Sequence, residues 1–515
     1  MSKKEKAKKR AVKRERRQFE KSVKKGHSLE NVPAINQLIF NVNDGLNFGI
    51  KTSLGGYKHI GRLAQEDGHC MTVGFPGCGK TEGPVKVTLS TWKGRIVFID
   101  IKGDSDGLEI WRHRFHPERR LKIFNPMKSN TARFDPFRFL KRGGEENLAR
   151  YARDVAQAIL PISPDVGVNK VWVRLAQNLL TATIIYFYSI EAEFNDTMMA
   201  VQRHSVPRLV EMIVNSRDDA ASEELVRGII ADPVKMNRQM LARLFVSKIE
   251  GLKSEIKAGI GMDLGEFIAL AVDPLIQSAF NTKDETVDTI DWADFLSDED
   301  DYDVLIQIPE YLLDQWEPMI ALMLTQLFDT LERRPEEHSM GAPQPLLIML
   351  DEFPRLGTCN TVKNALATLR SRGVTFSLFI QNLAQLDARY GRNGRREILG
   401  CCAYKLLMGV AEPDDQEYFS REIGETSTVQ TQVSVGCDQN GEVVSRNYSF
   451  SEGRKRLVAP KELGYLKDES ILITPKGPCR IEKAFCYDTK FFECLIRPHN
   501  LPRFYYEYGM VPEGY

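Results

Sequence analysis

Short apolar runs alternate with helical stretches along much of this 515-residue chain. Each run is rich in β-branched and other apolar residues, which predicts a buried strand. The runs lie at 69–73, 95–100, 303–308, 346–350, 374–380, 404–410 and 471–473. Helical spacing of apolar residues separates most of them, which is typical of a parallel sheet with helices on both faces. We therefore predict an α/β fold with a mainly parallel sheet.

One long segment interrupts this alternation. Between about Glu145 and Phe280, strand-like runs are scarce and apolar residues recur every three or four positions, as from Leu148 to Ile159. The most apolar stretch, 179–190, is shorter than the roughly 18 residues that a membrane span needs, so we expect it in a domain core. The pattern predicts an inserted all-α domain.

Two polar segments carry weaker signals. Residues 426–456 contain the turn signal Asp-Gln-Asn-Gly at 438–441, which predicts a long hairpin or a mobile loop. The acidic run from Asp298 to Asp303 is expected to be a solvated loop rather than a metal site.

Charge is balanced overall but not along the chain. The sequence has 70 Lys and Arg and 70 Asp and Glu, so no net field draws the protein to nucleic acid or membrane. Residues 1–30 differ, because Lys and Arg predominate from Lys3 to Lys25. This tail holds no core and is expected to be disordered or an exposed helix. Its function is either that of an arm for DNA or anionic lipid, or merely that of a solvated helix.

The expected compartment follows from three absences in the sequence. No segment has roughly 18 uninterrupted apolar residues, and no apolar stretch follows the basic tail as it would in a secretory signal. The nine cysteines form no C-x-x-C pair and no cluster with zinc spacing, so reduced thiols are the default. We expect a soluble or peripheral cytoplasmic protein, whose basic tail would make any contact with the inner face of the cell membrane.

The strongest motif is a phosphate-binding loop. Residues 74–81 read Gly-Phe-Pro-Gly-Cys-Gly-Lys-Thr, a complete G-x-x-x-x-G-K-[ST] pattern. Its glycines let backbone N–H groups point at a phosphate, Lys80 reaches the β- and γ-phosphates, and the Thr81 hydroxyl is placed to ligate Mg²⁺. A helix from Thr81 to Trp92 is expected to hold the anion at its N-terminus. The loop predicts a nucleoside-triphosphate site with ATP and Mg²⁺ as cofactors, formed by Gly74, Phe75, Pro76, Gly77, Cys78, Gly79, Lys80, Thr81 and Glu82.

A second motif ends the apolar run at 346–350. Asp351 and Glu352 follow it directly, as in a Walker B strand. We expect Asp351 to hold Mg²⁺ through water, beside the Thr81 hydroxyl, and Glu352 to orient and deprotonate the attacking water. An N-cap and a surface acid are the alternative interpretation.

Two further residues are catalytic candidates by position. Gln381 ends the run at 374–380, where an amide can hydrogen-bond the γ-phosphate or the lytic water. Arg370 lies just upstream and could act in trans as an arginine finger on a neighbouring subunit's nucleotide. The alternatives are an ordinary polar strand end for Gln381 and a solvated helix end for Arg370.

These motifs stand in the order of a known family. The chain resembles the type IV secretion coupling proteins, the conjugative DNA-transfer ATPases of the TraG/TraD kind. Besides the phosphate loop, the resemblance rests on Asp-Ile-Lys-Gly-Asp at 100–104, Phe-Asn-Pro at 124–126, Phe-Asp-Pro-Phe at 134–137, Leu-Asp-Glu-Phe-Pro-Arg-Leu-Gly at 350–357 and Ile-Gln-Asn-Leu-Ala-Gln-Leu at 380–386. It runs from about residue 50 to about residue 490.

The resemblance implies a RecA-like P-loop ATPase. Its nucleotide-binding domain would comprise residues 31–144 and 286–515, and its all-α domain residues 145–285, after a tail at 1–30. A homo-hexameric ring would drive DNA or a relaxase–DNA complex toward the type IV secretion channel. The nucleotide would be served by Lys80, Thr81, Asp351, Glu352 and Gln381, with Arg370 as the finger.

The N-terminus departs from the family, whose members usually begin with transmembrane helices where this chain has a basic tail. A soluble DNA pump of the FtsK or HerA kind, without a secretion partner, is therefore a second reading. A nucleotide-binding substrate-recruitment adaptor is a third, although the intact Lys80, Asp351 and Glu352 argue against it.

Overall fold

Seven parallel strands form the centre of the computed structural model. It describes residues 3–22, 39–40, 44–53, 56–101, 107–128, 131–162, 170–215, 232–283, 286–297, 301–336, 344–356, 360–437 and 443–488. In order across the sheet, the parallel strands are β12 (Tyr404–Gly409), β4 (Cys70–Gly74), β11 (Val374–Ile380), β10 (Leu346–Leu350), β5 (Arg95–Asp100), β9 (Tyr302–Gln307) and β6 (Arg120–Phe124). Antiparallel strands extend the sheet beyond β12, namely β15 (Glu469–Thr474), β16 (Gly477–Glu482), β2 (Gly45–Ser53), β3 (Gly56–Leu63) and β1 (Ile39–Phe40).

All the strands predicted from apolar runs are present. Alternate side chains of the parallel strands enter two cores: Val97 and Ile99 of β5 lie in one, and Ile96 and Phe98 in the other. Burial on both faces is the reason that these strands are continuously apolar. Within this sheet, the strands that were not predicted are β16, β2, β3 and β1 in the antiparallel part and β6 at the far edge. Most of them include polar residues or glycines in their sequences.

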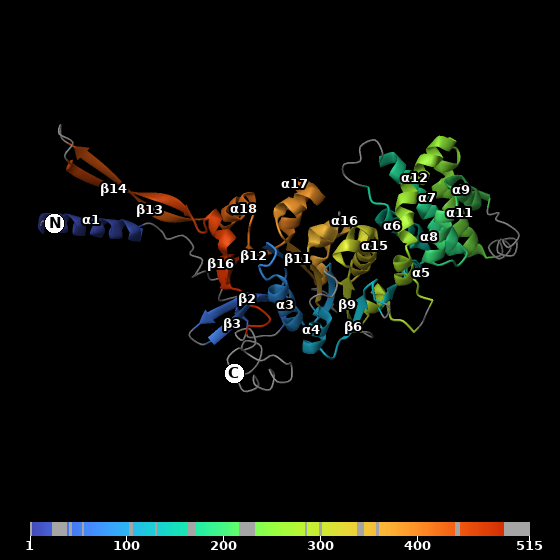
Figure 1. The fold of residues 1–515 in the computed structure, drawn as a ribbon, viewed down its shortest axis with the longest axis horizontal. Helices are drawn as coiled ribbons and strands as arrows, with labels where there is room; N and C mark the ends of the chain where they lie inside the picture. The colour runs from blue at the N-terminus through green and yellow to red at the C-terminus, as the bar shows by residue number, and fades with distance from the viewer. Residues whose placement is uncertain are drawn as a thin grey trace.

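Helices cover both faces of the sheet (Figure 1). α3 (Lys86–Thr91) and α4 (Leu108–Phe115) pack together on one face. α15 (Leu313–Leu331), α16 (Asn360–Thr368) and α17 (Leu383–Cys401) adjoin one another on the other face. The arrangement confirms the predicted α/β class, and α18 (Pro413–Ile423) continues the chain beyond β12.

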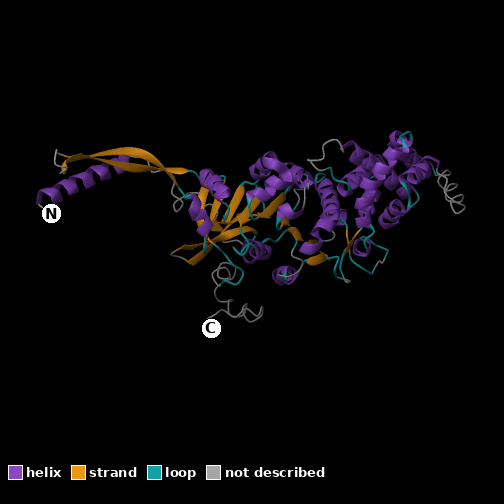
Figure 2. Cartoon of the chain, turned by 45° about the horizontal axis from the view of Figure 1, so that its top comes forward, coloured by secondary structure: helices purple, strands orange, loops and turns teal. Residues whose placement is uncertain are grey.

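A separate group of helices lies at one end of the sheet (Figure 2). α7 (Lys170–Ser189) is at its centre and contacts α6 (Leu148–Ile159), α8 (Phe194–Arg203), α9 (Val206–Asn215), α11 (Pro233–Glu250) and α12 (Ser254–Ala271). The apolar stretch predicted to lie in a core belongs to α7 and is largely buried. A short parallel pair, β7 (Arg133–Phe134) with β8 (Thr289–Ile290), brings together the two chain segments that flank these helices.

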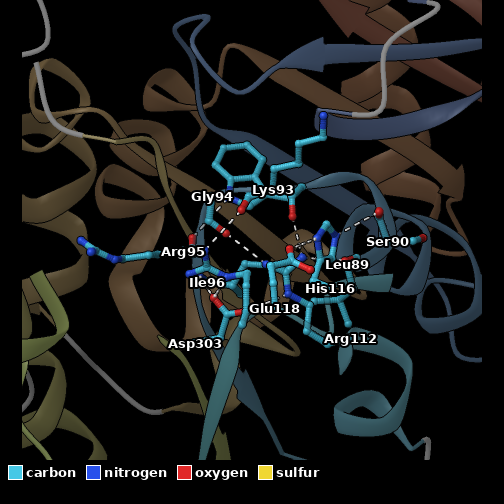
Figure 3. A network of polar contacts seen from close by, with 12 residues as sticks. Leu89, Ser90, Lys93, Gly94, Arg95, Ile96, Arg112, His116, Glu118 and Asp303 are labelled. Atoms are coloured by element: carbon cyan, nitrogen blue, oxygen red, sulfur yellow. Dashed lines mark hydrogen bonds and ion pairs between the residues drawn. The ribbon is translucent and has the colours of Figure 1, made fainter. Parts of the chain in front are cut away.

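At the amino edge of the parallel strands, buried charges are paired with one another (Figure 3). Asp303 at the start of β9 is 2% exposed and accepts from Arg112 Nε at 2.7 Å, Arg119 Nε at 3.0 Å and the Ile96 N–H at 2.9 Å. Arg112 also donates to the carbonyl oxygen of Leu89 in α3 at 2.8 Å. The expectation of a solvated acidic loop is therefore wrong for Asp303, because two arginines neutralise it in the interior; residues 298–300 lie outside the described ranges.

An arm projects from the sheet (Figure 1). It consists of the antiparallel hairpin β13 (Glu425–Cys437) and β14 (Val443–Arg456) with helix α1 (Lys3–Ser22) against it. The basic tail is thus helical over its described part, and the segment at 426–456 is a hairpin; the turn signal at 438–441 lies outside the described residues. Among the described helices, none is both long and apolar enough to cross a membrane.

Candidate nucleotide-binding site

The carboxyl ends of the parallel strands meet at a cavity of about 850 Å³. Loops after parallel strands converge at this edge, where α/β proteins bind their ligands. The lining comprises residues 75–82 of the phosphate loop, then Ile101, Glu310, Glu352, Arg355 and Gln381 after other strands, and finally Gly464, Tyr465, Leu466, Lys467, Lys483, Phe485 and Tyr487. A smaller cavity of about 320 Å³, beside Phe134 and Gln326, contains none of the predicted site residues.

The phosphate loop has the backbone that its glycines permit. Gly77 and Gly79 have φ values of +81° and +94°, which side-chain-bearing residues rarely adopt. A Cβ on Gly79 would lie 2.4 Å from Cε1 of Phe485, so this position also needs glycine for space. The predicted helix starts with a wider, π-type turn at Thr81–Val85, which contains Pro84. In this turn the Val85 N–H donates to the carbonyl of Lys80, five residues earlier, at 3.2 Å.

Lys80 and Glu352 face each other across the cavity floor. The Lys80 Nζ donates to the Gly74 carbonyl and lies 3.6 Å from Glu352 Oε1. Both side chains are buried, at 7% and 6% exposed. Glu352 Oε2 is buried without a hydrogen-bond partner, which is costly unless a ligand or water meets it.

Glu352 also has a strained backbone. Its φ is +47°, and positive φ in a residue other than glycine costs of order 1–3 kcal/mol and clusters at functional sites. The preceding Asp351 is 2% exposed and its N–H donates to the Ile99 carbonyl at 3.1 Å, which ties the end of β10 to β5. Asp351 does not belong to the cavity lining.

The oxygen donors near the phosphate loop fit a magnesium–nucleotide complex. Within the described ranges, no group of three or more His, Cys, Asp and Glu could hold an ion. Mg²⁺ usually takes one or two protein oxygens and completes its shell with phosphates and water. The Thr81 hydroxyl would be one such oxygen, and Asp351, which does not line the cavity, would hold the ion through water.

The structure separates the two remaining candidates. Gln381 lines the cavity, and its backbone N–H donates to Gln385 Oε1 at 3.2 Å at the start of α17. Arg370 precedes the other end of β11 and is 60% exposed, with its Nε 4.0 Å from Asp67 Oδ2. It does not reach this chain's cavity, so a role on its own nucleotide is not supported.

The sequence analysis missed the wall that the C-terminal strands contribute. Burial lowers the pKa of Lys483, whose Nζ donates to the carbonyls of Leu466 at 2.9 Å and Cys78 at 3.3 Å. Phe485 and Tyr487 stack with ring centres 5.2 Å apart and planes 4° apart. Alternating aromatics just after β16 were the available signal, but nothing local connects them to a loop some 400 residues earlier in the chain.

A protein-family model described as type IV secretory system conjugative DNA transfer matches residues 17–503 of the chain. The chain belongs to this family. Family relatives include VirD4 of Rhizobium rhizogenes, 23% identical over 456 residues, and TraG of Escherichia coli, 23% identical over 414 residues. These matches cover 84% and 76% of this chain but 61% of each relative, so the chain spans about three fifths of their length.

Solved structures of a conjugative coupling protein share the fold. TrwBΔN70 in its unbound monoclinic form has a TM-score of 0.59 at 15% identity, covering 90% of this chain and 95% of that one. TrwB in complex with ADP and Mg²⁺ has a TM-score of 0.53 at 16% identity, covering 81% and 85%. The likeness confirms the RecA-like P-loop fold class.

Proposed function

We propose that this chain is an ATP-driven DNA translocase that couples a conjugative or mobile-element substrate to a type IV secretion channel. The observation that carries the proposal is the buried Lys80–Glu352 pair beside the phosphate loop, with one carboxylate oxygen unpartnered. Family membership and the ADP and Mg²⁺ of the TrwB complex support the choice of ligand and of substrate class.

The proposed chemistry divides among a few residues. The Thr81 hydroxyl, and Asp351 through water, would hold Mg²⁺, which would neutralise phosphate oxygens when bound. A γ-phosphate beside Lys80 would compete for its ammonium group and so release Glu352. The freed carboxylate then orients and deprotonates the attacking water. Gln381 lies at the same edge, where its amide would hydrogen-bond the γ-phosphate or this water.

The aromatic wall has a role in this scheme. The Tyr487 side chain is 68% exposed while its ring stacks on Phe485, which packs against Gly79 of the loop. A nucleobase could stack on such a surface. We therefore assign Phe485 and Tyr487 to the base of the nucleotide.

Assembly would complete the motor. Arg370 is exposed and far from its own cavity, which is the disposition that a trans-acting finger in a homo-hexameric ring requires. DNA or a relaxase–DNA complex would pass through such a ring toward the secretion channel.

The protein would work in the cytoplasm, with the all-α domain at 145–285 between the two parts of the motor at 31–144 and 286–515. The basic helix α1 would provide any contact with the anionic inner face of the membrane.

The test is ATP hydrolysis by the purified protein with and without single-stranded and double-stranded DNA, beside Lys80→Ala. We expect turnover to rise severalfold with DNA and to be lost in the variant together with tight ATP binding. Tight ATP binding without turnover under any DNA condition would contradict a translocase and favour the recruitment adaptor. DNA-stimulated turnover in a protein whose removal leaves conjugative transfer unchanged would favour the soluble pump.

A further inference from the structure

The arm concentrates positive charge in a chain that is neutral overall. Helix α1 carries eleven Lys and Arg against three Glu. Arg10, Lys13, Arg14 and Arg17 are exposed, and none of the four has an ion-pair partner in the part of the chain that is described. By contrast, Arg16 is paired with Glu20 at 2.9 Å, so only some of the charge is compensated within the helix.

An aromatic residue of α1 contacts the hairpin. Val12 and Phe19 are half-buried, and the Phe19 ring lies 6.3 Å from that of Phe450 in β14. These two are the apolar residues among the described side chains of α1, and the other described side chains are polar or charged. A helix of this kind attracts phosphates electrostatically but has little apolar surface to insert into a bilayer.

The hairpin places exposed apolar and aromatic side chains beside this basic helix. β13 and β14 alternate, so that Val433 opposite Tyr448 shares a face with Val435. Val433 and Val435 are each 49% exposed, and Tyr448 is 37% exposed. Between residues 430 and 434, the opposite face is polar and uncharged, with amides and hydroxyls from Gln430, Gln432, Ser434, Asn447, Ser449 and Ser451.

We propose that this arm is a binding surface for single-stranded DNA. Proteins hold unpaired strands with cations along the backbone and aromatic rings for the bases, and the arm offers α1 for the first and Tyr448 for the second. A duplex hides its base faces and would use only the charge. The choice of DNA as the polymer rests on the proposed function, whereas the surface itself does not.

The base of the arm is fixed to the motor. Arg456, the last residue of β14, donates to Glu417 at 3.0 Å and to Ser420 Oγ at 3.1 Å, and its Nε lies 3.3 Å from Glu425. Tyr465, which lines the nucleotide cavity, follows nine residues later. Single-stranded DNA bound to the arm would therefore have a defined position relative to the ATP site.

The test is fluorescence anisotropy of the full chain with labelled oligothymidine about 30 nucleotides long, against a duplex of the same length, without nucleotide and from about 50 to 200 mM salt. One variant combines Arg10→Glu, Lys13→Glu, Arg14→Glu and Arg17→Glu. Its matched control keeps the charge with Arg10→Lys, Lys13→Arg, Arg14→Lys and Arg17→Lys. Tyr448→Ala and its control Tyr448→Phe probe stacking, and circular dichroism verifies that each variant is folded.

Charge reversal should weaken oligothymidine binding at least about tenfold at low salt and flatten the slope of log K against log salt by about 3, while the control binds normally. Tyr448→Ala should lose roughly fivefold on oligothymidine and little on the duplex. Unchanged oligothymidine affinity after charge reversal overturns the proposal. The proposal is also overturned if charge reversal abolishes binding of the protein to phosphatidylserine vesicles but leaves its affinity for DNA intact. Because no ATP is present, either result leaves the hydrolysis proposal standing.

Discussion

Buried charges lie at both ends of the parallel strands, and the clusters around Asp303 and Glu352 differ in how far they are compensated. At the amino edge, the Asp303 carboxylate meets two arginines and a backbone N–H, so its charge is fully partnered. At the carboxyl edge, Lys80 lies 3.6 Å from Glu352, whose second oxygen has no partner and whose backbone is strained. A pair that is satisfied serves the fold, whereas an unsatisfied and strained one indicates a site that expects a ligand.

Replacing the unsatisfied carboxylate should have the largest effect. Glu352→Gln removes the base but retains shape, so we expect turnover to fall by about 10⁴-fold, the upper end for general-base catalysis. ATP binding, measured with a fluorescent analogue, should persist, because Lys80 and the loop are intact. Hydrolysis at the wild-type rate would mean that Glu352 is not the general base. The unsatisfied carboxylate at the carboxyl edge would then no longer indicate a catalytic site.

Arg370 is the exception that could break the comparison, because it lies at the amino edge and yet is assigned to catalysis. If it acts in trans, Arg370→Ala should lower turnover by about 10³-fold, the lower end for arginine fingers. Mixing it with Glu352→Gln subunits should restore part of the activity, since the second variant supplies an intact finger to the first variant's intact base. A mixture as inactive as its components would leave Arg370 as a surface residue beside Asp67.

The amino edge should respond in stability rather than in chemistry. Asp303→Asn leaves the buried Arg112 without a counter-charge, whereas Arg119 keeps its ion pair with Asp301. We expect a loss of about 3 kcal/mol in the free energy of unfolding, measured by urea denaturation. Asp301→Asn is the matched control: that carboxylate pairs with Arg95 and Arg119 but is 49% exposed, and it should cost less than about 1 kcal/mol. Equal losses in the two variants would show that burial of Asp303 is not what matters.

The predictability of the two edges also differs, for a physical reason. Strands β10 and β11 were predicted at their observed bounds, because burial on both faces makes their sequences continuously apolar. The phosphate loop and Glu352 could be proposed from sequence because phosphate chemistry demands short motifs of adjacent residues, and both line the same cavity. The pairing of Asp303 with Arg112 joins residues 191 positions apart, and no local pattern records such a contact.

The C-terminal wall of the cavity escaped prediction in the same way. Lys483 bonds the Cys78 carbonyl across 405 positions, and the antiparallel strand β16 that delivers it carries polar residues among its apolar ones. The arm was predicted in parts, as a basic tail and as a long hairpin or a mobile loop. Their association depends on the contact between Phe19 and Phe450, which neither segment shows alone.

The smallest expected effect tests whether the carboxyl edge extends to this missed wall. Tyr487→Ala removes one ring of the stacked pair, and we expect ATP affinity to fall roughly fivefold, about 1 kcal/mol for one aromatic contact. Tyr487→Phe should retain affinity, because the ring and not the hydroxyl is needed. Inorganic tripolyphosphate, which has no base, should bind the wild type and Tyr487→Ala equally. If the variant weakens tripolyphosphate as much as ATP, then Tyr487 acts by shaping the phosphate loop through Phe485 and Gly79, and the base must lie elsewhere in the cavity.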